Sequence, residues 1–344
     1  MSGENVVSID GALVRDAINS DIDRSELPDY QVEMLDIIDH VDEYAWERGE
    51  LGGLDFGFPQ LTREVNGLQP AMYLIAGPPN VGKSAYALQL AWQVAHNNED
   101  AYVIYWALDD RKEDILPRVV SMDQRVPINV IKIPERYVGQ ENLMQRRTQG
   151  LNRLRGSVDK FKLLDQGEGQ TIEKLEEIIQ RHKMHLEMND PDKKLVVFVD
   201  NFYDLMSESQ TFNGDNQKYE YIATKMDDMI EQYDVPIVST AELRKLNGNR
   251  RPTPDDLRST IKLQYMAKVI MLCYNEVGFR GEAANVFWQK HNVEEKQPVL
   301  EVRLGKNKLG SFKGRLFYQF WADQSYLCEV PKEQARNMNA RITV

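Results

Sequence analysis

Short apolar runs alternate with helical patterns along most of the chain. Each run is bounded by polar, glycine or proline residues and is too short for a helix, so we expect buried strands. The expected strands are Ala71–Ala76, Ala101–Leu108, Leu195–Val199, Pro236–Thr240, Lys268–Tyr274, Val299–Leu304 and Arg315–Phe320, the last two forming a closing pair. Helices are expected over Ser84–His96 and Thr171–Met188, the latter within a largely polar, helical stretch from 135 to 194. This alternation predicts an α/β fold with a mostly parallel central sheet flanked by helices on both faces.

The first 50 residues follow a different pattern. Residues 1–27 are polar and acidic with little periodicity, which is typical of an arm without a fixed fold. Between Pro28 and Arg48 apolar residues recur at helical spacing among acids, and this predicts an amphipathic helix that ends at the following glycines. We therefore divide the chain into an acidic arm with a helix (1–50), a main α/β domain (51–330) and a C-terminal tail (331–344).

Charge and composition narrow the class of protein. The net charge is −12, but the first 50 residues hold 14 acidic and three basic residues, so the rest is nearly neutral and basic clusters there are free to bind nucleic acid. No run approaches the ~20 apolar residues of a membrane span, and the N-terminus lacks a secretory signal pattern. The two cysteines, Cys273 and Cys328, have no metal-ligand spacing. We expect a cytoplasmic protein that does not bind membranes.

A phosphate-binding loop follows the first expected strand. Its sequence fits G-x-x-x-x-G-K-[ST] between a strand and a helix, the context in which backbone amides surround a phosphate and the lysine reaches the β- and γ-oxygens. Ser84 is the expected Mg²⁺ ligand. The residues expected to bind nucleotide are Gly77, Pro78, Pro79, Asn80, Val81, Gly82, Lys83, Ser84 and Ala85.

Two carboxylates are candidates for the remaining chemistry. Asp200 ends the apolar run Val196–Asp200, the pattern of a second Mg²⁺ anchor. Asn201 follows it, so the group that orients the attacking water must come from elsewhere. Asp109 ends the strand after the phosphate-loop helix, where RecA-type ATPases place theirs, and we take it as this catalytic residue. The alternative is that Asp109 and Asp110 are turn residues.

With these motifs placed, the chain from Gly52 to Phe320 resembles the RecA-like ATPase domain of DnaB-type replicative helicases. The resemblance rests on the segments Phe56–Leu61, Asn66–Gln69, Ala107–Asp110 with Arg118, Val235–Arg244, Arg251–Arg258 and Gly305–Gly310. It implies a hexameric ring that uses ATP and Mg²⁺ to move along single-stranded DNA, with a primase or loader protein as partner. It implies Arg118 as a nucleotide-binding residue. The compact form suggests a protein of a phage or mobile element.

Three positions depart from the family pattern. Asp109 replaces the usual catalytic glutamate, Glu242 replaces a sensor glutamine, and Lys308 stands where an arginine finger is expected. The resemblance places Lys306 and Lys308 at the tip of the closing hairpin, reaching the nucleotide of the neighbouring subunit. Lysine offers one point charge instead of a bidentate fork. ATP binding is therefore expected, and the speed of hydrolysis is open.

Two loops are expected to face DNA. The first is Ser207–Lys218, which is polar. The second, Arg244–Arg251, has four bases and no acid, and its expected DNA contacts are Arg244, Lys245, Asn247, Arg250 and Arg251. Few aromatic residues lie nearby, so we expect contacts to the DNA backbone more than base stacking. The alternative is a solvated basic loop.

Several interpretations stay open at this point. The chain is interpreted first as a DnaB-type helicase, second as another RecA-superfamily ATPase of RadA or KaiC type, and third as a structural or loading subunit that binds ATP and hydrolyses it slowly. The helix of residues 28–48 corresponds either to the family's linker helix, which docks on the adjacent subunit, or to a helix that folds back on its own domain. The acidic arm either represses DNA binding or serves as a partner-binding or solubilising tail.

Overall fold

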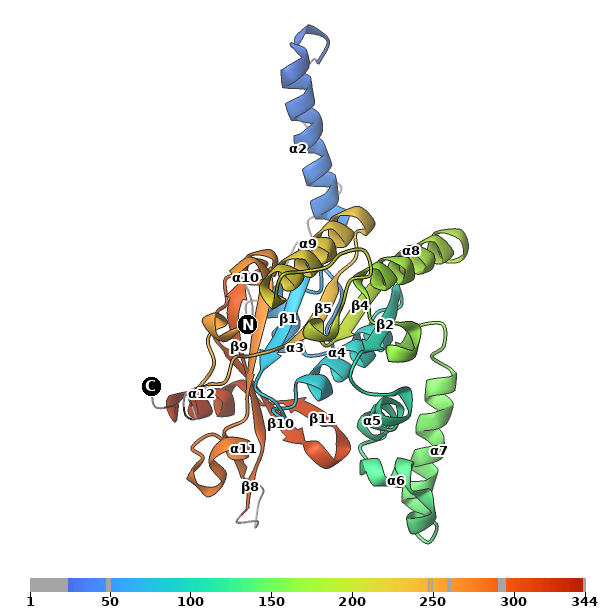
Figure 1. Cartoon of the computed structure of the whole chain (residues 1–344), viewed down its shortest axis with the longest axis vertical. Coiled ribbons are helices and arrows are strands. Elements are labelled where there is room, and N and C mark those ends of the chain that lie inside the picture. Colours follow the sequence, from blue (N-terminus) through green and yellow to red (C-terminus); the bar gives the residue numbers. More distant parts are fainter. Residues whose placement is uncertain are drawn as a thin grey trace, which may run out of the picture. The chain divides into compact units, whose positions relative to one another are not determined.

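The computed structural model describes residues 24–47, 51–246, 248, 250–258, 261–289 and 295–342. The chain divides into two units, residues 1–50 and 51–344. The first contains helix α2 (Asp29–Glu47), which agrees with the amphipathic helix expected there. Its apolar stripe is at least half exposed at Met34, Ile37 and Val41. The second unit is an α/β domain (Figure 1).

A central sheet organises the second unit. In the described residues its strand order is β11-β10-β9-β6-β1-β5-β4-β2-β3. The six strands from β6 to β3 run parallel, whereas β9, β10 and β11 pair antiparallel at one edge. The strands are β1 (Met72–Gly77), β2 (Ala101–Ala107), β3 (Phe161–Leu164), β4 (Lys194–Asp200), β5 (Ile237–Glu242), β6 (Val269–Tyr274), β9 (Val299–Asn307), β10 (Arg315–Trp321) and β11 (Tyr326–Glu329), with a separate ribbon of β7 (Trp288–Gln289) and β8 (Lys296–Gln297). The mostly parallel sheet expected from the sequence is confirmed.

Helices cover both faces of this sheet (Figure 1). The two faces of β1 show the arrangement, because Tyr73 and Ile75 pack with α3, α4 and α5, whereas Met72 and Leu74 pack with α8, α9 and α10. The helices of this unit are α3 (Pro59–Val65), α4 (Lys83–Asn97), α5 (Lys112–Gln124), α6 (Ile128–Lys132), α7 (Glu141–Arg155), α8 (Ile172–Asn189), α9 (Asp215–Tyr233), α10 (Ile261–Met266), α11 (Glu276–Arg280) and α12 (Lys332–Ala340). Strands buried on both faces explain why the sequence shows continuous apolar runs.

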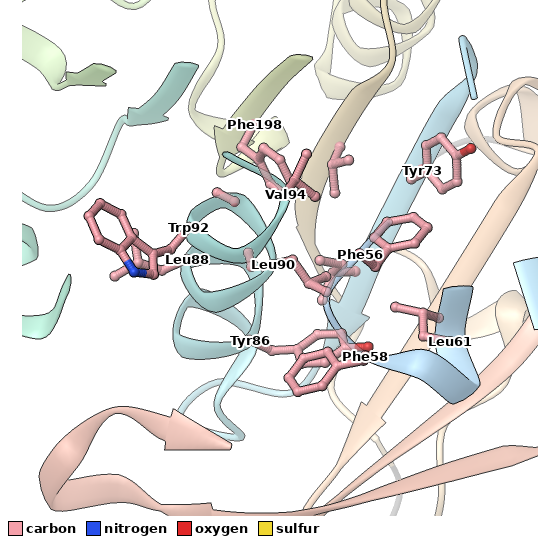
Figure 2. Packing of buried hydrophobic residues seen from close by; sticks show 14 of the residues in the cluster. Phe56, Phe58, Leu61, Tyr73, Tyr86, Leu88, Leu90, Trp92, Val94 and Phe198 are labelled. Atoms are coloured by element: carbon pink, nitrogen blue, oxygen red, sulfur yellow. The ribbon is translucent and has the colours of Figure 1, made fainter. Parts of the chain in front are cut away.

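Helix α4 is the centre of one half of the core. Figure 2 shows Tyr86 and Leu90 of this helix on the side of Phe56, Phe58 and Tyr73, whereas Leu88 and Trp92 lie on its other side. Phe58 stacks on Tyr86 with ring centroids 5.8 Å apart and packs against Tyr318 of β10 at 4.8 Å. The start of α4 and the end of β1 are therefore held in a rigid, close-packed frame, and this frame fixes the loop between them.

The expected strands and helices lie within three residues of their observed bounds, whereas the internal helices α5 and α9 have no counterpart among the helices expected from the sequence. The edge strands β3 and β11 were missed, because short edge strands carry little apolar signal. The loop expected over Ser207–Lys218 ends at Gly214, since Asp215 begins α9 and an acid in the first turn favours the helix. The expected tail contains α12, whose Met338 is 6% exposed and packs on β9 and β10.

Candidate functional site

The carboxyl ends of the parallel strands bring the expected catalytic groups together. Gly77 at the end of β1 lies beside Glu242 at the end of β5. Asp200 at the end of β4 lies beside Ala107 at the end of β2, two residues before Asp109. In an open parallel sheet this edge is where ligands bind, because loops diverge there and leave a crevice.

The loop between β1 and α4 has the backbone of a phosphate site. Asn80 and Gly82 have positive φ angles of 59° and 108°. Gly82 is the N-cap of α4, and its positive φ favours glycine there, while a Cβ on it would also lie close to the ring of Phe320, at 3.2 Å. The first turn of α4 contains Lys83, Ser84 and Ala85, whose amides point into the loop as the orphan donors of a helix start.

Lys83 is held ready for an anion. Its Nζ donates a hydrogen bond to the carbonyl of Pro78 at 2.9 Å. Burial lowers the pKa of Lys83, while the negative charges of Asp200 and Glu242 raise it. A phosphate in the loop would be a stronger partner for the ammonium group than this neutral carbonyl.

Asp200 is fixed from two sides. It is 9% exposed, Tyr105 Oη donates to its Oδ2 at 2.7 Å, and Thr240 Oγ1 donates to its Oδ1. Within the described residues no three side chains of the usual metal-binding types converge as a cage. A single buried, hydrogen-bonded carboxylate fits Mg²⁺, which takes one or two carboxylates along with substrate phosphates.

The structure adds a carboxylate that the sequence analysis missed. Asp204 lies in the turn after β4 and accepts a hydrogen bond from Asn201 Nδ2 at 2.9 Å. Burial raises the pKa of Asp204, and the negative charges of Asp109, Glu242 and Asp200 raise it further. Asp204 is therefore close enough to these three carboxylates to be affected by their charge. The only sequence signal for Asp204 is its position four residues after Asp200, which has meaning once the turn is known.

Arginines neutralise two positions at the rim. Arg118 on α5 lies 3.0 Å from Asp110 (Nη1 to Oδ2), so the arginine expected to bind nucleotide is paired with the neighbour of Asp109. Arg258 lies 3.0 Å from Glu242 (Nη1 to Oε2), which offsets the extra negative charge at the sensor position.

The two loops expected to face DNA follow β4 and β5 at this same edge. Glu173 of α8 holds the first: its Oε1 accepts from Ser207 Oγ and Ser209 Oγ, both at 2.6 Å. Burial raises the pKa of Glu173, but these hydrogen bonds and that of the Glu208 amide outweigh it and lower the pKa to about 2. No local pattern in the sequence indicates this anchor, because it lies on a distant helix.

The second loop contains two kinds of basic residue. Arg244 and Lys245 are exposed, and Arg250 pairs with Asp256 while its side chain stays 46% exposed. Asn247 lies outside the described residues. Arg251 is different: it is 14% exposed and pairs with the buried Glu276 and Glu301. Its guanidinium points into the domain, so we correct the expectation that it contacts DNA.

The two lysines of the closing hairpin lie at the opposite end of the sheet. Lys306 pairs in register with Ile270 near the start of β6, and the Lys308 amide donates to the carbonyl of Lys268 at 2.9 Å. Both side chains line one cavity of about 920 Å³ with Ile261 of α10. Strand β9 continues to Asn307, so Lys306 belongs to the strand and not to the hairpin tip as expected. The phosphate loop of the same chain lies at the other end of the sheet, after β1.

Comparison with known proteins shows that the chain is similar to replicative DNA helicases. The replicative DNA helicase DnaB of Leifsonia xyli subsp. xyli is 22% identical over 264 residues, covering 74% of this chain and 54% of that protein. The replicative DNA helicase DnaB of Haemophilus influenzae is 25% identical over 300 residues, covering 84% of this chain and 57% of that protein. The chain thus spans about half the length of the curated relatives it matches.

Two solved structures and a protein family are also similar to this chain. One solved structure, an ATPase domain, matches with a TM-score of 0.72 at 20% identity, covering 86% of this chain and 97% of that chain. A structure of a DnaB-like replicative helicase and its interactions with primase matches with a TM-score of 0.70 at 20% identity, covering 93% of this chain and 70% of that chain. The expected RecA-like fold is confirmed. The family described as "DnaB-like helicase C terminal domain" matches residues 53–321, and the chain belongs to this family.

Proposed function

We propose that this protein is a ring-forming, ATP-dependent helicase of DnaB type that moves along single-stranded DNA during replication. The observation that carries the proposal is the common edge of the parallel strands. The phosphate loop, Asp109, Asp200 and Glu242 meet there, and the two loops that follow β4 and β5 leave from the same edge. The proposed nucleotide site and the proposed DNA-binding loops are therefore next to each other, so a change at one can move the other.

ATP is proposed to occupy the loop of residues 77–85. Lys83 would exchange the Pro78 carbonyl for the β- and γ-phosphate oxygens, and the amides of the first turn of α4 would bind the β-phosphate. Ser84 and Asp200 would hold Mg²⁺, which neutralises charge on the phosphates when bound. The hydrogen bonds from Tyr105 and Thr240 keep Asp200 oriented for that contact.

Asp109 is proposed to orient the water that attacks the γ-phosphate. It is exposed at the end of β2 and shares its surroundings with Asp204, whose raised pKa reflects that shared negative charge as well as burial. Glu242, paired with Arg258, is the proposed sensor of the γ-phosphate. Arg118 would bind nucleotide only after leaving Asp110.

Arg244, Lys245, Asn247 and Arg250 are proposed to contact phosphates of single-stranded DNA. Backbone contacts of this type give affinity without sequence preference and a strong dependence on salt. Arg251 is left out of this set because its charge is balanced by buried carboxylates.

The position of Lys306 and Lys308 supports their action on a neighbouring subunit. They lie at the end of the sheet opposite the phosphate loop of the same chain, which favours an approach to a nucleotide across a subunit interface, as a hexameric ring would require. Burial and the charges of Lys308 and Lys268 lower the pKa of Lys306 to about 8. A phosphate from the neighbour would raise this pKa again, because a negative charge nearby favours the ammonium form.

The exposed stripe of α2 is proposed as the docking element of the ring. Docking on the adjacent subunit and docking on its own domain are both consistent with an exposed apolar stripe at Met34, Ile38 and Val41. A primase or a loader protein is the proposed external partner. No helix in the described part of the chain has the length and apolar character needed to cross a bilayer.

The test is DNA-stimulated ATP hydrolysis followed by unwinding of a forked duplex from the 5′ side. Stimulation by single-stranded DNA separates a helicase from a slowly hydrolysing subunit, a second candidate favoured by Asp109, Glu242 and Lys308. Directional unwinding separates it from other RecA-type ATPases. ATP binding without stimulated turnover would support the second candidate and refute the helicase.

A further inference from the structure

A cavity lies between the phosphate loop and the basic loop. It has a volume of about 320 Å³, which is at the small end of ligand sites. Pro78 and Pro79 form one wall, and Arg244, Lys245 and Arg250 line another part. These lining residues belong to the loops proposed to bind ATP and the DNA backbone, but neither proposal assigns a ligand to the cavity between them.

Two aromatic rings complete the lining of this cavity. Tyr274 at the end of β6 and Phe279 on α11 stack with their centroids 5.2 Å apart and their planes 13° apart. Tyr274 is 2% exposed, whereas Phe279 is 38% exposed. The Arg251 guanidinium lies 5.0 Å from the Tyr274 ring centroid, and its pairing with Glu276 and Glu301 fixes it there. The partly exposed Phe279 therefore rests on a rigid base.

We propose that this cavity receives an unstacked base of single-stranded DNA, which lies against Phe279. The inference rests on the proposed function and deepens it, because it adds a base contact to the backbone contacts of Arg244 and Lys245. Cations beside an aromatic surface are the usual means of holding a single strand, with phosphates on the cations and a base on the ring. Every base has a π-face, so the site needs no sequence preference.

The sequence alone suggests the opposite, because few aromatic residues lie near the basic loop in the chain. The fold supplies them from another element. Strand β6 lies next to β1, and the turn into α11 brings Phe279 to the neighbourhood of Leu246, which lies in the loop after β5. Backbone tracking alone is therefore an incomplete description of the proposed DNA contact.

The cavity also shares a wall with the nucleotide site. The carbonyl of Pro78 accepts the Lys83 hydrogen bond, and phosphates in the loop would compete for that ammonium group. Release of the Pro78 carbonyl would alter the wall that the base touches. Base binding is thus expected to differ between the nucleotide-free and nucleotide-bound protein.

The test compares two labelled oligonucleotides of equal length, one of thymidines and one of abasic residues, by fluorescence anisotropy of the full chain. Each titration is done with and without a non-hydrolysable ATP analogue. The variant Phe279→Leu keeps an apolar side chain but removes the ring, and Phe279→Tyr keeps the ring. Phe312→Leu is the matched control, because Phe312 lines a different cavity beside α3, β10 and α12.

Phe279→Leu should weaken thymidine binding by about 5- to 100-fold per stacked base and leave abasic binding unchanged. Phe279→Tyr and Phe312→Leu should bind both oligonucleotides like the wild type. An unchanged ratio of thymidine to abasic affinity in Phe279→Leu would overturn the inference and leave the proposed function standing. Loss of ATP-analogue affinity in that variant, without loss of DNA affinity, would overturn it too and assign the cavity to the nucleotide base instead. A wild type that binds neither oligonucleotide would overturn both the inference and the proposed function.

Discussion

Replacing Arg251 with methionine is expected to destabilise the domain and to leave its contacts with DNA phosphates intact. The guanidinium donates from Nε and Nη2 to the two oxygens of Glu301 at 2.7 and 2.6 Å, and from Nη2 to Glu276 at 2.9 Å. These carboxylates are 2% and 1% exposed. The substitution removes the positive charge and leaves both carboxylates in a site with little access to water.

The expected loss in the free energy of unfolding depends on the partners that each carboxylate retains in the variant. Breaking a buried ion pair by removing one partner costs about 3–5 kcal/mol. Glu276 retains Arg280 at 3.2 Å and the Val286 amide at 3.0 Å, whereas Glu301 retains Arg315 at 4.0 Å. Because Glu276 stays partly satisfied, we expect the lower end, about 3 kcal/mol, which is a large part of the ~5–15 kcal/mol that stabilises a typical domain.

The loss should depend on pH. Burial raises the pKa of Glu301 and Arg251 lowers it, so the variant carboxyl should take up a proton more readily. A buried neutral carboxyl costs less than a buried charge, and the destabilisation should therefore be smaller at about pH 5 than at about pH 8. The double variant Arg251→Met, Glu301→Gln should recover part of the lost stability.

Urea denaturation at fixed protein concentration measures the change in stability, and the salt dependence of single-stranded DNA binding measures the DNA contact. Arg250→Ala is the matched neighbour: it should reduce the salt slope by about 0.7, whereas Arg251→Met should leave the slope unchanged. Wild-type stability in Arg251→Met, together with a reduced slope, would refute the structural role and return Arg251 to the DNA interface.

Four further outcomes are expected. Lys83→Ala should abolish ATP hydrolysis, because the β- and γ-phosphates lose their main cation, and unchanged turnover would contradict the phosphate-loop assignment. Lys306→Ala and Lys83→Ala proteins, each inactive alone, should regain partial ATPase activity when mixed; co-assembly without activity at any ratio would argue against action in trans. Deleting residues 1–27 should strengthen DNA binding at low salt and have little effect above ~0.2 M, and equal affinities at low salt would show that the arm does not repress binding. Glu173→Gln should lose the stability that wild-type Glu173 contributes above pH 4.5, a contribution lost as pH falls toward its folded pKa of about 2; identical acid unfolding of the two proteins would show that the loop anchor carries no stability.

Local patterns in the sequence predict the elements that carry long apolar runs and the groups that follow them. The phosphate loop, Asp200 and Asp109 were found because each comes directly after a buried strand, and parallel strands place their carboxyl ends on one edge. Because these groups directly follow their strands in the chain, the same local patterns predict both the strands and the position of the groups.

The pairing of side chains that are distant in the sequence is visible only in the folded domain. A basic residue in a loop suggests a DNA contact, and nothing local distinguishes Arg250, which is half exposed, from Arg251, which is buried against Glu276 and Glu301. Likewise Asp204 gains meaning from its burial near the charges of Asp109, Glu242 and Asp200, and Phe279 from the packing of α11 beside the basic loop. The physical reason is that burial and charge pairing are set by neighbours across the fold, and a side chain's role depends on those neighbours as much as on its own chemistry.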